Sequence, residues 1–401
     1  MIKFDFDAEC CGCSACAQIC PKKCISMSEN NEGFLAPETN AYECVGCGLC
    51  EKACPVLNAK PESKINDNIP TEVYAAYNND EVARLNSSSG GIFMMLAEYT
   101  VKNGGIVFGA RLSKDCKSVY HCSSDSIDEI WKFSGSKYVQ SNINETYKQV
   151  KTHLEAEHLV LFTGTPCQIE GLLHYLPKKY ENLICMDFIC HGVPSPKVYR
   201  KYIEYMEKDN AEIYNVHFRD KSSGWSNLSM RLDYSSRESR IEPYNENVFG
   251  SAFLCDLCLR RSCYECKFRK ANHSSDMTVG DFWSIEREVP ELYDNKGVSV
   301  ILINTLKGKK IFDDIKSGLT YKKVNFYSAE KNNAIIKQPK INKNRQRFFK
   351  DLDSMDFKKN VKKNIHRHCY LVRVFRKLAK ALLKSILGEE RCREIAKIVR
   401  K

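Results

Sequence analysis

The sequence predicts a small α+β head, an α/β body with a mixed sheet, and a basic helical tail at the C-terminus. Three observations lead to this prediction. Ten of the first 54 residues are cysteine, strand-like and helix-like apolar patterns alternate from residue 72 onward, and residues 357–401 contain fifteen Lys or Arg against three Glu. A chain of 401 residues is also too long for one ordinary core, so we expect more than one domain.

The expected boundaries follow changes in composition along the chain. The cysteine-dense head covers residues 1–57, and the polar segment 58–71, which has two prolines and no apolar period, is predicted to be a linker. The N-terminal part of the body covers 72–150, and its C-terminal domain covers 151–345. The basic tail takes residues 346–401.

The cysteine content and the charge restrict the class of protein. The chain has 21 cysteines, yet it does not open with a secretory signal, and no apolar run reaches the ~18–20 residues of a membrane-spanning helix. We therefore expect a cytoplasmic protein whose reduced thiols hold metal, not a disulfide scaffold. The net charge of +11 comes from the tail, because residues 1–356 sum to −1, which argues against nucleic-acid binding by the body.

Two runs in the head share the spacing C-x2-C-x2-C-x3-C-P. Bacterial ferredoxins with two 4Fe-4S clusters have this spacing, and the fourth cysteine of each run ligates the cluster of the other run. We therefore assign one cluster to Cys10, Cys13, Cys16 and Cys54, and the other to Cys44, Cys47, Cys50 and Cys20. A zinc site would use paired C-x2-C units instead. Cys11 and Cys24 fall outside the spacing and are predicted to be unliganded thiols.

The body alternates strands and helices. Short apolar runs bounded by Gly, Pro or polar residues predict strands at 72–77, 106–112, 158–164, 183–189 and 298–304. Apolar residues at helical spacing predict helices at 92–102 and 169–176. This alternation favours a mixed or parallel sheet.

A second group of cysteines lies late in the body. Cys255, Cys258, Cys263 and Cys266 have the spacing C-x2-C-x4-C-x2-C. Judged by local spacing alone, these four thiols would bind one metal.

Five stretches of the body together resemble one known family. They are "NSSSGGIFMMLAEY" (86–99), "FSGSKYVQS" (133–141), "LFTGTPCQIEGL" (161–172), "CHGVPSP" (190–196) and "CYECKFRKANHSSDMTVGDFW" (263–283). The chain resembles the beta subunit of coenzyme F-420 hydrogenase/dehydrogenase, in the version with a fused ferredoxin head. The resemblance runs from the head to about residue 310. It implies an α/β flavoprotein body that binds FAD, carries a third 4Fe-4S cluster, and passes electrons between the clusters and a two-electron substrate.

The resemblance also implies the ligands of the third cluster. They are the cysteines of "GTPCQ", of "CHG" and of the C-x2-C before "DMTVGDF", namely Cys167, Cys190, Cys263 and Cys266. Cys167 and Cys190 each follow an apolar strand, so both would project from the same edge of a sheet. Cys255 and Cys258 remain the alternative ligands beside Cys263 and Cys266.

The flavin site implied by the resemblance lies in two loops, with candidate residues Ser88, Ser89, Gly90 and Gly91 in the first and Ser136, Lys137 and Tyr138 in the second. The first loop opens a helix, where hydroxyls, free amides and the positive end of the helix dipole suit phosphate groups. An ordinary serine N-cap would also explain these serines at the start of a helix. His191 could donate a proton near the flavin or simply bond to the backbone, and no catalytic residue is assigned.

These features predict an iron–sulfur flavoprotein oxidoreductase that moves electrons between its clusters and a substrate through FAD. Coenzyme F-420 or another small molecule is the substrate by analogy, and the expected partner is a soluble electron carrier, either ferredoxin or the deazaflavin coenzyme. The alternative is a non-catalytic electron-transfer subunit that connects a partner enzyme to a soluble donor. Residues 369–401 predict a basic amphipathic helix that could contact the inner face of a membrane, dock on a partner or pack on the body.

Overall fold

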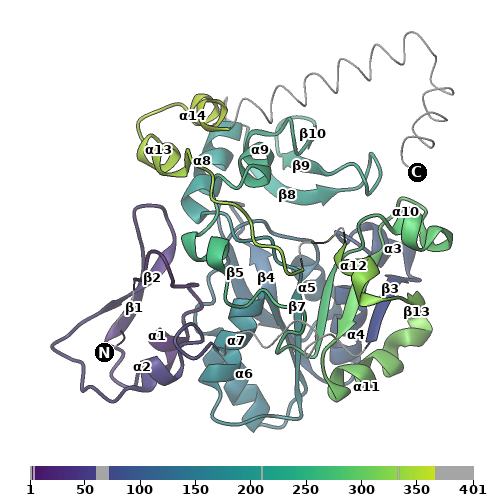
Figure 1. The fold of residues 1–401 in the computed structure, drawn as a ribbon, viewed down its shortest axis with the longest axis horizontal. Coiled ribbons are helices and arrows are strands. Elements are labelled where there is room, and N and C mark those ends of the chain that lie inside the picture. Colours follow the sequence, from purple (N-terminus) through teal and green to yellow (C-terminus); the bar gives the residue numbers. More distant parts are fainter. Residues whose placement is uncertain are drawn as a thin grey trace.

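The structure is a computed structural model that describes residues 2, 5–59, 72–208, 211–331, 333 and 335–365. Within these residues the chain forms a small head, a large mixed sheet covered by helices, and a smaller sheet with its own helices (Figure 1). The predicted amphipathic segment at 369–401 and nearly all of the predicted linker lie outside the described residues.

The body is built on one eight-stranded sheet. Its strands are, in spatial order, β13 (Leu319–Lys323), β3 (Glu72–Asn78), β12 (Ser299–Ile303), β11 (Met277–Asp281), β7 (Leu183–Phe188), β6 (Val160–Gly164), β4 (Ile106–Leu112) and β5 (Val119–Ser124). β4, β6, β7 and β11 run parallel, and the other neighbours pair antiparallel. The prediction of a mixed sheet is therefore confirmed. The strands come from both sides of residue 150, so the two predicted parts of the body share one sheet.

The parallel centre of the sheet is covered on both faces, and this explains why its strands are apolar throughout. One face packs against α4 (Ile92–Lys102) and α11 (Leu306–Ile315), and the other packs against α6 (Thr146–Glu155) and α7 (Pro166–Tyr175). Short helices in the connections complete the body: α3 (Glu81–Leu85), α5 (Ile127–Ile130), α10 (Ile285–Glu288) and α12 (Phe326–Glu330). The helices thus leave the carboxyl ends of β6 and β7 as the edge from which loops reach the candidate site.

A smaller antiparallel sheet lies at the top of the view in Figure 1, and its strands are β8 (Ile213–Asp220), β9 (Ser229–Tyr234) and β10 (Arg240–Pro243). It shares a core with α8 (Pro196–Met206), α9 (Val248–Leu254), α13 (Arg345–Lys350) and α14 (Phe357–Asn364). Phe348 and Val361, from the last two helices, are buried in that core. The first twenty residues of the predicted tail are therefore packed structure.

The head consists of α1 (Ala15–Ile19), the hairpin of β1 (Ile25–Glu29) and β2 (Leu35–Thr39), and α2 (Leu49–Lys52). α1 contacts α6 and α7 of the body, which lie beside the head in Figure 1. Gly12 permits a second close approach between head and body, because a Cβ atom at this position would lie 2.6 Å from Nε2 of Gln140.

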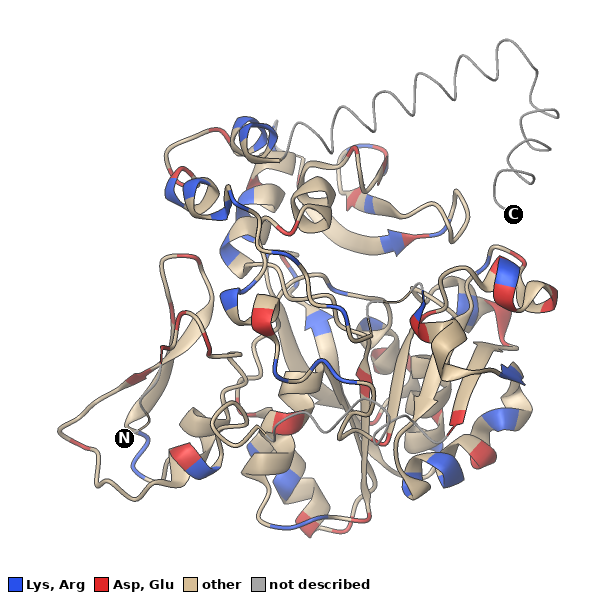
Figure 2. Ribbon diagram, in the orientation of Figure 1, with Lys and Arg blue, Asp and Glu red and all other residues tan. Residues whose placement is uncertain are grey.

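Charged side chains of both signs are interspersed over the described body (Figure 2), and Lys and Arg are frequent on α13 and α14. Among the described residues, none of the helices combines the length and apolar character needed to span a membrane.

Candidate functional site

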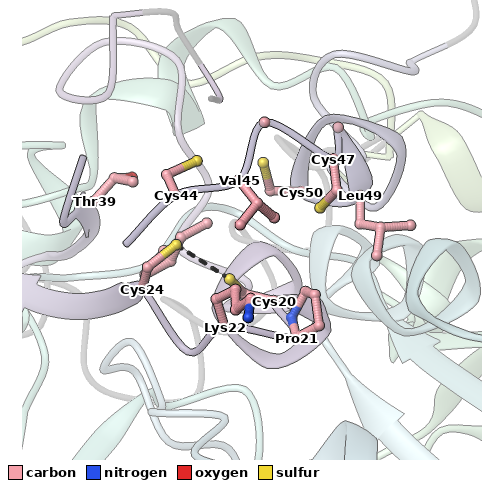
Figure 3. A pocket seen from close by; sticks show the side chains of 13 residues that line it. Cys20, Pro21, Lys22, Cys24, Thr39, Cys44, Val45, Cys47, Leu49 and Cys50 are labelled. Atoms are coloured by element: carbon pink, nitrogen blue, oxygen red, sulfur yellow. Dashed lines mark hydrogen bonds between the residues drawn. The ribbon is translucent and has the colours of Figure 1, made fainter. Parts of the chain in front are cut away.

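Fourteen of the nineteen described cysteines line three cavities, two of which lie in the head. The first is lined by Cys20, Cys44, Cys47 and Cys50, the four thiols predicted to hold one cluster (Figure 3). Cys20 belongs to the other sequence run and reaches this cavity from the end of α1, as the crossed ligand pattern requires. Cys24 also lines the cavity, with its sulfur 3.4 Å from that of Cys20, and this contact raises the pKa of Cys24 to about 11.

The second head cavity is lined by Cys10, Cys13, Cys16 and Cys54, the other predicted set. All four are buried. Burial, followed by the neighbouring thiols Cys10 and Cys54, raises the pKa of Cys16 to about 12. Cys11, predicted to be unliganded, also lines this cavity.

The third cavity lies in the body and has a volume of about 160 Å³. Its lining includes the thiols predicted for the third cluster, Cys167, Cys190, Cys263 and Cys266. Cys167 follows β6 in the first turn of α7, and Cys190 follows β7 after one residue. β6 and β7 are parallel neighbours, so both thiols lie at the same edge of the sheet.

The alternative ligands Cys255 and Cys258 do not line this cavity. Cys258 has no exposed surface and belongs to the core of the smaller sheet, and Cys255 ends α9. The structure thus brings the spatially assembled set together and places the first half of the local C-x2-C-x4-C-x2-C pattern elsewhere.

Burial is the largest influence on the pKa of three of the four body thiols, Cys190, Cys263 and Cys266. Burial, and then the charge of Cys263, raises the pKa of Cys190 well above its ordinary value, and burial with Cys266 raises that of Cys263 to about 12. Crowded thiols do not all ionise without a cation, whereas a bound metal cluster takes them as thiolates. Arg260 and Arg269 also line the cavity and are only 2% and 5% exposed, so their positive charges suit an anionic cluster with four thiolates.

The thiols of each set do not converge on a single point. Within the residues that the structure describes, no three His, Cys, Asp or Glu side chains are arranged to hold one metal ion. A cubane places four irons at separate corners, each with its own thiolate, so spread-out ligands are compatible with a 4Fe-4S cluster.

Cys11 lines both the second head cavity and the body cavity. The hydrogen bond that the Cys167 thiol donates to Cys11 is the largest influence that raises the pKa of Cys167, and burial adds to it. The two cavities are therefore neighbours that share one thiol. The sequence spacing gave no signal for this position, because the contact joins residues 156 positions apart.

The two loops predicted to hold a flavin lie together. The main-chain N–H of Ser136 donates to Oγ of Ser88 at 2.7 Å, and Ser89 Oγ donates to the carbonyl of Val298. Gly90 packs so closely against β3 that a Cβ atom would lie 2.5 Å from the carbonyl oxygen of Ala76. Both serine side chains therefore have partners within the chain, which leaves the amides at the start of α4 to meet a ligand.

Lys137 and Tyr138 occupy different positions in this region. The ammonium of Lys137 donates to the main-chain carbonyls of residues 132, 133 and 134, and burial lowers its pKa to about 7. The Tyr138 hydroxyl accepts from Arg219 at 3.3 Å, and its ring packs against Phe253. Lys137 therefore stabilises its own loop, whereas Tyr138 contacts the guanidinium of Arg219.

Three further cations lie beside the first loop and were not singled out from the sequence. Lys221 donates to the carbonyl of Ser89 at 2.6 Å and to that of Arg84 at 2.8 Å. Burial, followed by repulsion from Arg219, lowers the pKa of Lys221 to about 7. Asp281 and Asp294 neutralise Arg219 and Arg84, but Lys221 has no carboxylate among the hydrogen-bond partners that the structure gives it. The ammonium of Lys221, like that of Lys137, already donates to three main-chain carbonyls, so it can attract an anionic ligand through its charge but has no N–H group left to donate to it.

His191 bonds to a side chain, not to the backbone. Its Nε2 lies 2.6 Å from Oδ1 of Asp256, and its ring contacts Phe253 edge-on. It does not line the body cavity.

Comparison with known proteins finds two family models, and the thiols that line the three cavities fall within the residues that they match. Residues 9–58 match the family described as 4Fe-4S dicluster domain, and residues 158–326 match the one that describes the C-terminal part of the coenzyme F420 hydrogenase/dehydrogenase beta subunit. The chain is 23% identical over 332 residues to a coenzyme F420-dependent sulfite reductase of Methanocaldococcus jannaschii, covering 79% of this chain and 47% of that protein. The chain therefore spans about half the length of this curated relative.

Among solved structures, a chain of the F420-reducing [NiFe] hydrogenase complex from Methanosarcina barkeri is similar, with 14% identity and a TM-score of 0.45. The match covers 74% of this chain and 89% of the other. The family models bear out the resemblance: residues 158–326 carry the domain described as the C terminus of the coenzyme F420 hydrogenase/dehydrogenase beta subunit, behind a 4Fe-4S dicluster domain at residues 9–58.

Proposed function

We propose that the chain is an iron–sulfur flavoprotein oxidoreductase that moves electrons between the clusters of its head and a two-electron substrate through FAD. The observation that carries this proposal is the continuity of the thiol-lined cavities. The second head cavity and the body cavity share Cys11, and Cys50 of the first head set is near enough to influence the pKa of Cys16 in the second. Three clusters in these positions would form one short path from the head to the body.

The body cluster is proposed to be held by Cys167, Cys190, Cys263 and Cys266. Their common cavity and the two buried guanidinium groups beside it support this assignment. Arg269 also donates to the main-chain carbonyl of Cys190, so it fixes one ligand loop in place. These residues would hold the cluster, keep water from it and offset its negative charge.

The flavin is proposed to lie at the loop of residues 87–91. When bound, FAD supplies the conversion between one-electron and two-electron transfer. The amides that open α4, which have no side-chain cap, would bind its phosphates, and the charge of Lys221 beside them would attract these groups. Arg219 is fixed by both oxygens of Asp281 and by Tyr138, so it can orient a ligand without moving.

Coenzyme F-420 is the proposed substrate, because the matched family and the curated relative both carry that coenzyme in their names. A different small molecule is the second choice. A soluble carrier, either ferredoxin or the deazaflavin itself, is the proposed partner, and a cytoplasmic location and a membrane contact through residues 369–401 stay predictions.

A second candidate function is an electron-transfer module without its own substrate. One observation favours it: the match covers only 47% of the curated relative, so the matched part of that protein is accompanied by other sequence. In this case a partner enzyme would receive the electrons.

Anaerobic assays with purified F-420 distinguish the two functions. The enzyme should reduce or oxidise F-420 when paired with a viologen dye, in proportion to its FAD content, and a Lys221→Glu variant should lose FAD and this activity while keeping its iron. Viologen-dependent cluster reduction without any turnover of F-420 or other small molecules would favour the module.

A further inference from the structure

His273 lies in the body cavity beside the four thiols proposed to hold the third cluster, and it is 7% exposed. Its Nδ1 is 2.8 Å from Oδ2 of Asp187, a residue of β7 that is 1% exposed. Its Nε2 is buried and has no hydrogen-bond partner within the chain. The imidazole is thus bonded on one edge, and its other edge lacks a partner inside a cavity lined by thiols.

The Asp187 carboxylate is itself held in place. Its Oδ1 accepts from Oγ1 of Thr278 at 2.6 Å, and Thr278 accepts from Nδ2 of Asn304 at 2.9 Å. The carboxylate can only accept, so the proton between Asp187 and His273 belongs to Nδ1. This network determines the orientation of the imidazole ring, in the way that carboxylates orient histidines next to metal centres.

Leaving a buried polar atom without a partner is unfavourable, so Nε2 of His273, which faces a cavity lined by thiols, points to a ligand there. The four thiols already supply one ligand for each iron of a cubane, which leaves hydrogen bonding to sulfur as the role of Nε2. With Nε2 protonated, the imidazolium would have a carboxylate on one side and an anionic cluster on the other, so its charge would be compensated on both.

We infer that His273 donates a hydrogen bond from Nε2 to a sulfur of the body cluster and raises its reduction potential, and that Asp187 is the positioning residue for this bond. The inference rests on the third cluster of the proposed function. A donor to sulfur favours the more negative, reduced state of a cluster, so it makes the cluster a better electron acceptor. His273 would therefore favour electron transfer from the head into the body.

The test is a redox titration of the full chain followed by electron paramagnetic resonance, with iron and sulfide counted in each sample. His273→Leu removes the donor, and His273→Gln keeps an N–H group near the position of Nε2. Asp187→Asn keeps the shape of the positioning residue but loses its charge. His191→Gln is the matched control, because His191 also pairs with a carboxylate and adjoins Cys190 but does not line the cavity.

We expect His273→Leu to lower the potential of one cluster and to remove an exchangeable-proton coupling from its spectrum. His273→Gln should recover part of the potential, Asp187→Asn should lower it less, and His191→Gln should leave it unchanged. An unchanged potential in His273→Leu, or equal shifts in the Leu and Gln variants, would overturn the inference. If the His273→Leu variant does not assemble the body cluster, the Asp187→Asn variant provides the test. An unchanged reduction potential of the body cluster in Asp187→Asn would then overturn the inference. Eight irons in the wild-type chain would instead remove the third cluster, and with it the proposed function on which the inference depends.

Discussion

The guanidinium of Arg260 reaches from the body to the head, where its Nε donates to the carbonyl oxygen of Cys10 at 2.5 Å. Its two other nitrogens bond to Gln140 Oε1 and to the carbonyl of Leu35, each at 2.9 Å. Gln140 in turn donates to the carbonyl of Cys11. A single buried side chain thus connects the first cysteine of the head to the wall of the body cavity.

Replacing Arg260 with alanine should loosen the head from the body. The change removes this donor from two buried acceptors and from one partly buried acceptor, so the free energy of unfolding should fall by about 1–3 kcal/mol or more. Denaturant unfolding of the anaerobic protein measures this. Arg200→Ala is the matched control, because Arg200 also joins body to head, through Glu29, but at an exposed site where an ion pair contributes about 0–1 kcal/mol. Equal losses in the two variants would show that Arg260 has no special role.

Removing one thiol of the body cavity should remove four irons and leave the head clusters intact. Cys167→Ala should therefore retain about eight irons per chain, while Cys258→Ala should retain about twelve. The reason is that Cys167 lines the cavity and Cys258 lies in a separate apolar core. Iron and acid-labile sulfide analysis distinguishes the two. A loss of iron in the Cys258 variant alone would assign the cluster to the local cysteine pattern.

Substitution of Cys11 and Cys24 tests whether a thiol that lies beside a cluster site is also a ligand of the cluster. Each lies beside four other thiols in a head cavity, but both stand outside the repeated spacing. Alanine at either position should leave the iron content unchanged. Iron loss in Cys24→Ala together with full iron in Cys20→Ala would show that the ligand roles of these two residues are reversed.

The sequence predicted some elements closely because local signals determine them. The helix expected at 92–102 and the strand expected at 106–112 have those bounds in the structure, since the Gly pair at 104 and 105 separates them. α7 begins three residues earlier than expected, because Thr165 and Gln168 form a capping box ahead of the apolar residues. Helix and strand bounds of this kind can be predicted from the sequence once the capping residues are considered.

The rest of the site depends on contacts between distant segments. Asp187 and His273 are 86 residues apart, and Arg219 reaches Asp281 across 62, so no local spacing relates them. The smaller sheet was not predicted either, because its strands mix charged and apolar residues and because the register shifts twice where β8 pairs with β9. Cys167 and Cys190 were predicted as cluster ligands only because they lie in motifs of the family. Local cysteine spacing alone would not have included them in the ligand set.

Lys221 should make the stability of the flavin-free protein depend on pH. Burial and then Arg219 lower its pKa to about 7 in the folded state, against about 10.4 when unfolded. Between these values the unfolded chain binds more protons, so this residue makes the free energy of unfolding rise with pH, by at most about 1.4 kcal/mol per unit. Lys221→Met should remove that slope between pH 7 and 9. If the free energy of unfolding changes with pH in the same way in the wild type and the variant, the lowered pKa of Lys221 is contradicted.

The stoichiometry of metal, sulfide and flavin in the anaerobically purified chain tests the central claim most directly. Three cubanes and one flavin predict about twelve irons, about twelve acid-labile sulfides and one FAD per chain. Eight irons would contradict the body cluster at Cys167, Cys190, Cys263 and Cys266. The absence of FAD from fully metallated protein that also fails to bind added FAD would contradict the flavoenzyme.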